Sequence, residues 1–303
     1  MQRMIIIKLI AAISILLCIP NIYAAQKDNK PTQVMILKII DHPALDQTTK
    51  GIIDYLGRNQ TVTRKFNIHT ESAQGQPILA KQIAQKYVSQ EPEIIIAVGT
   101  SAAQAFLPFH NQTKNPVIFT SVTDAITAGL ADNNNIPHLG FTGISNHVPV
   151  KEQMKFFRSL QPQLKKIGTI YNPSEINSVK ALTELENYCQ EQALDLVIAP
   201  ATKATEAAQA TYRLINEAEA IFINNDNNAL SAIKIITNIA KSKKVPVYSS
   251  DTDTIPLGAI AAYGVDQYKL GEQTAELALQ ILKDPKKIYS IQKAKAVIHQ
   301  ANH

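Results

Sequence analysis

The sequence predicts an α/β protein whose parallel strands are divided between two domains. Short apolar runs alternate with longer segments of helical periodicity, and most of the runs are continuous, as in strands buried on both faces. Alternation this regular implies right-handed βαβ units and parallel sheets. One stretch, residues 132–149, is rich in Asn, Gly and Pro and interrupts the alternation. We therefore expect the chain to cross there from one α/β domain to the other.

The first 25 residues are predicted to be a cleaved signal peptide. The charged start MQRMIIIK precedes the apolar run LIAAISILLCI, and Ile22 and Ala24 fit the −3 and −1 positions of a cleavage site. An uncleaved anchor and a lipoprotein are the alternatives. Lipidation would use Cys18, but the residue before it is Leu17, where a small residue is expected. The predicted location is the periplasm.

Composition excludes several classes of function. The two positive charges of the signal peptide leave with it, so the formal net charge falls from +5 to +3, which gives no reason to expect binding to nucleic acid. Only Cys189 remains, so no intrachain disulfide can form. The seven His residues show no paired metal-ligand spacing, and the sequence contains neither a phosphate loop nor a dinucleotide fingerprint. We expect a monomer that needs no metal and no cofactor.

Eight apolar runs are the predicted strands, and two intervening segments show clear helical spacing. Helices are expected at 78–88 and 270–282, where apolar residues recur every three or four positions, and another is expected to start near Pro149. The predicted strands are 33–40, 93–98, 116–122, 166–171, 194–199, 220–224, 245–249 and 259–263.

Polar side chains gather where these strands end. The strand at 116–122 runs into Ser-Val-Thr-Asp, and four other strands end in a similar way. In open parallel sheets, ligands bind beyond the carboxyl ends of the strands. The same residue types are preferred helix N-caps, so each of them alone also fits a purely structural role. The candidate ligand-binding residues are Thr100, Ser101, Ser121, Thr123, Asn172, Glu175, Ser178, Asp226 and Asp251.

A serine-dependent hydrolase is one alternative interpretation of these residues. Gly99, Thr100 and Ser101 form a strand-to-helix turn that resembles a nucleophile elbow. The second glycine of that motif is missing, and only His299 and His303 follow the last candidate acid.

Several segments in order resemble one known family. HPALDQTTKGIIDYL, AVGTSAAQAF, PVIFTSVTDAITAGL, TGISNHVPVKEQMKFFRSLQPQLKKIGTIYNPSEINSV, NNDNNAL and GVDQYKLGEQTAELALQIL are similar to the ABC transporter substrate-binding proteins of the tryptophan/tyrosine-binding type. The resemblance implies two Rossmann-like lobes of the type I periplasmic-binding architecture, a ligand cleft between them, and three crossing segments. The implied lobes are 26–143 with 265–288, and 144–264 with 289–303. The family commonly has Pro where this sequence has Ala125, and its usual C-terminal ending is absent.

The resemblance also implies a function. The chain would be the periplasmic binding component of an ABC importer, which closes on a small amino-acid-like ligand, often an aromatic one, and delivers it to an inner-membrane ABC permease. A periplasmic sensor for a signalling partner is the alternative. We expect closure about the crossing near residues 141–146.

Within this scheme the first-lobe hydroxyls are assigned to a ligand carboxylate. Asp226 is assigned to the ammonium group, with Asp251 as the second choice. Aromatic or imidazole groups near strand ends are candidates for the side-chain pocket, because the sequence contains no Trp. They are His42, Tyr171 and Tyr248.

Overall fold

A computed structural model describes residues 30–62 and 64–301. The predicted signal peptide, its cleavage site and Cys18 lie outside these described residues. Among the helices that the model describes, none is both long enough and apolar enough to span a bilayer.

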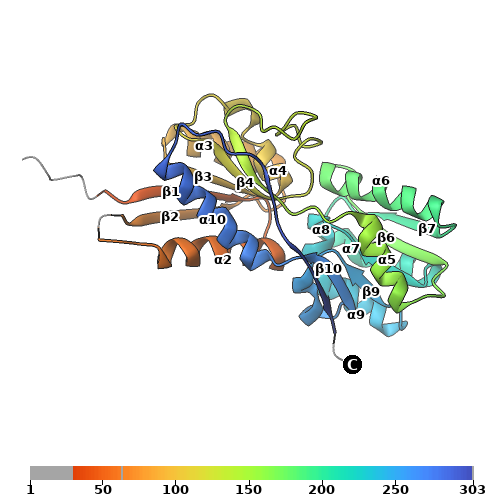
Figure 1. The fold of residues 1–303 in the computed structure, drawn as a ribbon. Coiled ribbons are helices and arrows are strands. Elements are labelled where there is room, and N and C mark those ends of the chain that lie inside the picture. Colours follow the sequence, from red (N-terminus) through yellow and green to blue (C-terminus); the bar gives the residue numbers. More distant parts are fainter. Residues whose placement is uncertain (1–29, 63, 302–303) are drawn as a thin grey trace, which may run out of the picture.

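The chain forms two α/β lobes that lie side by side (Figure 1), each built on a six-stranded sheet. The predicted α/β class with two lobes is confirmed, because two mostly parallel sheets each carry helices on both faces. All strand pairs are parallel except β10 with β12.

The first lobe contains the sheet β11-β5-β4-β3-β1-β2. Helices α2 and α10 pack together over one face, and α3 and α4 cover the other. Right-handed crossovers that run toward opposite edges of a sheet place their helices on opposite faces. Its elements are β1 (Thr32–Lys38), α2 (Pro43–Arg58), β2 (Phe66–Ser72), α3 (Pro77–Ser89), β3 (Ile94–Val98), α4 (Thr100–Gln104), the 3₁₀ turn η1 (Leu107–Phe109), β4 (Val117–Val122), β5 (Phe141–Ser145), α10 (Gln267–Lys283) and β11 (Gln292–Lys293).

The second lobe contains the sheet β12-β10-β9-β8-β6-β7. Helices α5 and α6 pack together over one face, and α7 and α9 pack together over the other. Its elements are α5 (Val150–Leu160), β6 (Lys166–Tyr171), α6 (Ile176–Glu191), β7 (Asp195–Pro200), η2 (Ala204–Glu206), α7 (Ala207–Glu217), β8 (Ala220–Ile223), α8 (Asn227–Ser231), α9 (Ile233–Ser242), β9 (Val247–Ser249), η3 (Thr252–Leu257), β10 (Ala261–Val265) and β12 (Ala296–Gln300).

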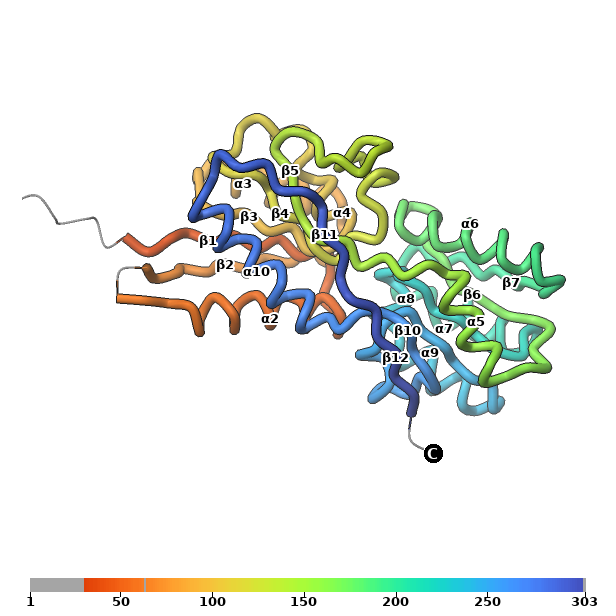
Figure 2. Tube along the Cα trace, in the orientation of Figure 1, coloured from red at the N-terminus to blue at the C-terminus, as the bar shows by residue number. Residues whose placement is uncertain are grey.

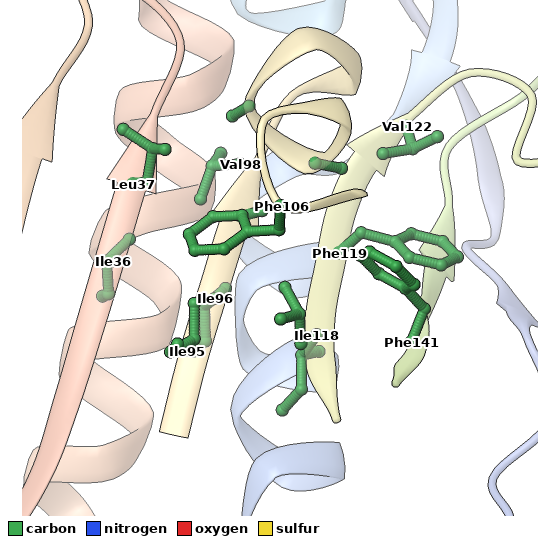
Figure 3. Packing of buried hydrophobic residues seen from close by; sticks show 14 of the residues in the cluster. Ile36, Leu37, Ile95, Ile96, Val98, Phe106, Ile118, Phe119, Val122 and Phe141 are labelled. Carbon is green, nitrogen blue, oxygen red and sulfur yellow. The ribbon is translucent and has the colours of Figure 1, made fainter. Parts of the chain in front are cut away.

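Continuous apolar strands supply the core of the first lobe (Figure 3). Ile36 on β1, Ile96 on β3 and Ile118 on β4 are fully buried, and Phe106 and Phe119 fill the space beside them. All eight predicted strands and the predicted helices are confirmed, with ends that shift by a few residues. The burial of both faces of β3 and β4 explains why their sequences do not alternate.

Four strands were not predicted, and each has a sequence that departs from the buried pattern. Strand β2 is an edge strand with a largely polar sequence, and β11 and β12 are short or exposed. Strand β5 (Phe141–Ser145) lies within 132–149, the stretch predicted to contain the crossing, and no strand was predicted there. At its centre is Gly143, where a Cβ would lie 2.1 Å from the backbone oxygen of Phe119. The close approach to β4 interrupts the apolar run that would have marked a strand.

The chain passes between the lobes at three places, which Figure 2 traces. The crossings follow β5, β10 and β11, at residues 146–149, at Asp266 and at residues 294–295. The first sheet therefore includes residues 144–145 and 292–293, which the sequence assigned to the second lobe. After α10 the chain runs first along β5, where β11 joins the first sheet. It then runs along β10, where β12 joins the second sheet.

Candidate functional site

A cavity between the lobes, here called the first cavity, contains about 320 Å³ of space that no atom fills, including space open to the solvent. Strand ends and helix starts of both lobes contribute to it. It is lined by His42, Ala44, Leu45, Thr100, Ser121, Thr123, Asn146, Asn177, Asn225, Asn227, Leu230 and Gln267. A second cavity beside it contains about 250 Å³, again including space open to the solvent, and shares the residues Thr123 and Asn225.

Ser121 faces the first cavity from a distorted part of β4. The register between β4 and β5 shifts between Phe119 and Val122, and Ser121 has a φ of +53°, in the left-handed region that a non-glycine residue rarely adopts. A bulge of this kind redirects a side chain, and such backbone strain is concentrated at functional sites. The Ser121 hydroxyl lies 3.1 Å from Oγ1 of Thr48, which donates to Oε1 of Gln267 at 3.0 Å. The Ser-Val-Thr-Asp end of β4 therefore directs the Ser121 hydroxyl toward the first cavity.

The opposite side of the first cavity contains an ordered amide network. Asn227 donates from Nδ2 to the Glu175 carboxylate at 2.6 Å, so its Oδ1 faces Nε2 of His42 at 3.2 Å. His42 must therefore donate from Nε2, which leaves Nδ1 as an acceptor. Burial lowers the pKa of His42 to about 4, and the imidazole is neutral at neutral pH. This contact also joins the first lobe to the second.

Three buried acceptor atoms of the first cavity lack a hydrogen-bond partner within residues 30–62 and 64–301. They are Nδ1 of His42, Oδ1 of Asn146 and Oδ1 of Asn177. Asn177 donates both to Glu175 and to the backbone oxygen of Asn225, which fixes the orientation of its amide. A buried polar atom without a partner costs about 1–3 kcal/mol, so such atoms in a cavity indicate that a ligand or water completes them.

The first cavity has a polar lining but no charged side chain among its lining residues. A net charge buried there would lack a countercharge, which costs several kcal/mol. The cavity therefore suits a ligand that is neutral overall, including a zwitterion, better than a simple anion or cation.

The structure places the predicted residues in three groups. His42, Thr100, Ser121 and Thr123 line the first cavity. Glu175 lies behind it and orients Asn177 and Asn227. The remaining predicted residues, which line neither the first nor the second cavity, are Ser101, Tyr171, Asn172, Ser178, Asp226, Tyr248 and Asp251.

Asp226 is a helix cap whose oxygens are already used. Its carboxylate accepts from Ala229 N–H at 2.8 Å, from Asn172 N–H at 2.6 Å and from the Ser178 hydroxyl at 2.6 Å. Burial and the nearby Glu175 carboxylate raise the pKa of Asp226 to about 7, against the opposite effect of these three donors. The predicted pairing of Asp226 with a ligand ammonium is inconsistent with this geometry.

We expect Asp226→Asn to reduce stability rather than ligand affinity. The new Nδ2 group would face a backbone N–H that now donates to the carboxylate, so a buried donor loses its acceptor. Urea unfolding at pH 5, below the raised pKa of Asp226 in the folded state, should show a loss of about 2 kcal/mol, whereas at pH 8 removal of the ionised buried carboxyl offsets this loss. Unchanged stability together with a more than tenfold loss of affinity would restore the ligand role.

The pocket candidate Tyr248 and the ligand-binding candidate Asp251 belong to the interior of the second lobe. Tyr248 stacks on Phe157, with ring centroids 4.8 Å apart, and its hydroxyl donates to Gln161. Asp251 is buried and caps η3 by accepting from the N–H of Asp253. Both lie at strand ends as expected, but their side chains turn into the lobe because strand-end side chains alternate in direction.

The sequence-based assignment missed the amides. Asn225 and Asn227 follow the same strand as Asp226, but an amide carries no charge that would mark it as a partner for a charged ligand. Asn146 and Gln267 lie at crossings, where the chain must pass the edge of the cleft. For Asn146 and Gln267, a polar residue beside a predicted crossing is the feature of the sequence that could have indicated a cavity residue.

Residues 33–300 match the family described as ABC transporter substrate binding protein. The chain is 31% identical over 267 residues to a tyrosine-binding protein of Clostridioides difficile (strain R20291). This match covers 86% of this chain and 76% of that relative. A conserved domain protein of Vibrio cholerae has a TM-score of 0.83 at 31% identity, over 89% of this chain and 92% of the other.

Two further solved structures differ in whether a ligand is bound. The domain from Streptococcus pneumonia in complex with L-Trp has a TM-score of 0.80 at 27% identity, over 89% of this chain and 92% of the other. The ligand-free, open structure of a Clostridium difficile substrate binding protein has a TM-score of 0.64 at 28% identity, over 88% of this chain and 91% of the other. Identity and coverage are nearly equal for these two structures. The chain belongs to the family of ABC transporter substrate-binding proteins.

Proposed function

We propose that this protein is an extracytoplasmic receptor that binds the zwitterionic head of an L-α-amino acid in the first cavity and delivers it to an ABC permease. The observation that carries the proposal is the set of three unpartnered acceptors in a cavity without charged lining residues. The proposed periplasmic location depends on the predicted signal peptide. Relatives named for tyrosine binding, or solved with L-Trp, support an amino acid as the ligand class.

The acceptor set fits a primary ammonium group. An ammonium carries three N–H donors and no acceptor, which matches Nδ1 of neutral His42 with the carbonyl oxygens of Asn146 and Asn177. Glu175 acts as a positioning residue, because it holds the Asn177 and Asn227 amides by accepting from their NH₂ groups. Its negative charge lies one layer behind the proposed ammonium site and favours a cation there.

The hydroxyls of the first lobe fit the carboxylate. Thr100, Ser121 and Thr123 come from adjacent strand ends and line the same cavity. Hydroxyl hydrogens rotate to suit a partner, and hydrogen bonds to a carboxylate are stronger than neutral ones. The ligand carboxylate is therefore proposed to bind the first lobe, as the sequence predicts, and the ammonium to bind the amides and His42 instead of Asp226.

Contacts across the cleft support binding by closure of the lobes. His42 bonds to Asn227, and Asn225 lies 3.5 Å from Oγ1 of Thr123. Lys180 on the second lobe lies 3.9 Å from Asp124 on the first. A ligand that touches both lobes stabilises this arrangement over an open one, because only the closed form completes its hydrogen bonds.

A non-enzymatic role agrees with the surroundings of Ser101. In the described part of the chain its hydroxyl makes no hydrogen bond with a histidine, and it does not line the first cavity. A nucleophilic serine needs an adjacent base. We therefore prefer a binding protein to the serine-dependent hydrolase.

The ammonium assignment is tested with pairs of ligands. Calorimetric titration should detect binding of L-tyrosine or L-phenylalanine, and the matching α-hydroxy acid should bind about thirtyfold more weakly, or about 2 kcal/mol. A hydroxyl offers one donor where the ammonium offers three. Scattering profiles should show a smaller radius of gyration with the amino acid bound.

Ser121→Ala and Ser101→Ala provide a matched pair for the same titration. We expect about tenfold weaker binding for Ser121→Ala, since only Ser121 lines the first cavity, and nearly normal affinity for Ser101→Ala. If none of the twenty L-amino acids binds, or if the hydroxy acids bind as well as the amino acids, the proposed function is wrong.

A further inference from the structure

The second cavity extends from the first toward the crossing that follows β5. It is lined by Thr123, His147, Val148, Val150, Gln153, Ala181, Glu184, Asn224, Asn225 and Ser250. The two cavities meet at Thr123 and Asn225, whose side chains lie 3.5 Å apart, at the outer limit of a hydrogen bond. A contact this weak can separate around a ligand atom that passes from one cavity to the other.

Asn224 is the unusual residue of the second cavity. The residue is 1% exposed, and neither Oδ1 nor Nδ2 of its side chain has a hydrogen-bond partner among the described residues. The neighbouring polar groups are engaged: Ser250 donates to Asn225, and Gln153 donates to the backbone oxygen of Tyr263. A buried amide with both of its atoms unpartnered requires an explanation, and the space beside it provides one.

The rest of the lining gives the second cavity an amphipathic character. Val148, Val150 and Ala181 form apolar wall, and the amide of Asn224 adds a group that can both donate and accept. His147 and Glu184 bind each other at 3.1 Å, so they are paired rather than available as free charges. A flat apolar body with a polar tip suits this combination, as in a phenol side chain.

We propose that the second cavity is the side-chain subsite of the ligand, and that Asn224 selects amino acids whose side chain ends in a group that both donates and accepts, such as the phenol of tyrosine. The proposal rests on the amino-acid function proposed above. The α-amino and carboxylate groups occupy the first cavity, and the side chain passes between Thr123 and Asn225. A site built to hydrogen-bond a hydroxyl discriminates strongly against the analogue that lacks it, because the buried polar group is then left unpaired.

The experiment compares L-tyrosine with L-phenylalanine, which differ by one hydroxyl. Calorimetric titration of the wild-type protein should give a ten- to hundredfold preference for L-tyrosine. Asn224→Leu keeps the approximate shape and removes both polar atoms. We expect the ratio of the two affinities to fall to within about threefold in this variant, through a loss for L-tyrosine and none for L-phenylalanine.

Thr113→Val is the matched control, since it also removes a buried unpartnered oxygen, but in the first lobe and outside both cavities. It should leave the ratio at the wild-type value. Ala181→Leu fills the subsite from α6 and should weaken both aromatic ligands, which keeps the proposal testable if Asn224→Leu does not fold.

The two proposals fail in different ways. Equal binding of L-tyrosine and L-phenylalanine by the wild type, or an unchanged ratio in Asn224→Leu, overturns the subsite and leaves amino-acid binding intact. The second cavity would then hold water only. The absence of binding by any amino acid overturns both proposals.

Discussion

Gly271→Ala is expected to destabilise the first lobe by about 3 kcal/mol, because it would force apart the two helices that cover one face of the sheet. Gly271 on α10 and Gly51 on α2 meet at the helix crossing. A Cβ on Gly271 would lie 2.1 Å from the backbone oxygen of Thr48 and 2.9 Å from the backbone nitrogen of Ile52. Backbone atoms cannot move aside as a flexible side chain can, so one helix must shift as a whole.

The same crossing positions part of the first cavity. Thr48 contacts both Ser121 and Gln267, and Gln267 begins α10 directly after the second crossing between the lobes. A shift of α10 away from α2 therefore separates groups that line the first cavity. We expect Gly271→Ala to lower ligand affinity as well as stability.

Gly57→Ala is the control within the same helix pair. An added Cβ at Gly57 meets nothing within 4 Å, and alanine is the better helix former, so this variant should gain about 0.5–1 kcal/mol. Urea unfolding of the two variants and the wild type measures both effects. A loss below about 1 kcal/mol for Gly271→Ala would show that the helices accommodate the methyl group.

The strands and helices that bury apolar faces could be predicted from the sequence, because burial leaves a direct pattern. Strands β3 and β4 are buried on both faces and stand out as unbroken apolar runs. Strand β2 at the sheet edge leaves no such pattern, since its exposed positions carry polar residues. Strand β5 was hidden by Gly143, which serves the packing against β4.

The location of the candidate cavity could be predicted from the sequence, but the role of each residue could not. The rule that ligands lie beyond strand ends correctly identified Thr100, Ser121 and Thr123 as cavity residues. The sequence could not tell a cap from a cavity residue at neighbouring positions. Asp226 caps α8 while Asn227, one residue later, faces the cavity, and that choice depends on side-chain direction.

The last prediction concerns Asp251, whose burial makes the stability of the second lobe depend on pH. Asp251 is 1% exposed, and its Oδ2 has no hydrogen-bond partner in the described chain. Burial, and then the charge of Asp253, raise the pKa of Asp251 to about 7, and burial raises the pKa of Asp253 to about 6. A carboxyl whose pKa is higher in the folded state holds its proton more tightly there. Its contribution is therefore present below pH 4 and is lost as the pH rises toward 7.

Asp251→Asn should remove this dependence, because an amide stays neutral and its Oδ1 can still accept from the N–H of Asp253 to cap η3. Near pH 4 the variant and the wild type should be equally stable. At pH 8 the variant should be more stable by on the order of 4 kcal/mol, the free energy of a shift of about three pH units. Urea unfolding at pH 4, 6 and 8 measures the difference, with the exposed Asp195→Asn as a control that should follow the wild type. Parallel curves for Asp251→Asn and the wild type from pH 4 to 8 would mean that Asp251 ionises in the folded lobe as readily as in the unfolded chain, and its burial would then require a donor close to Oδ2.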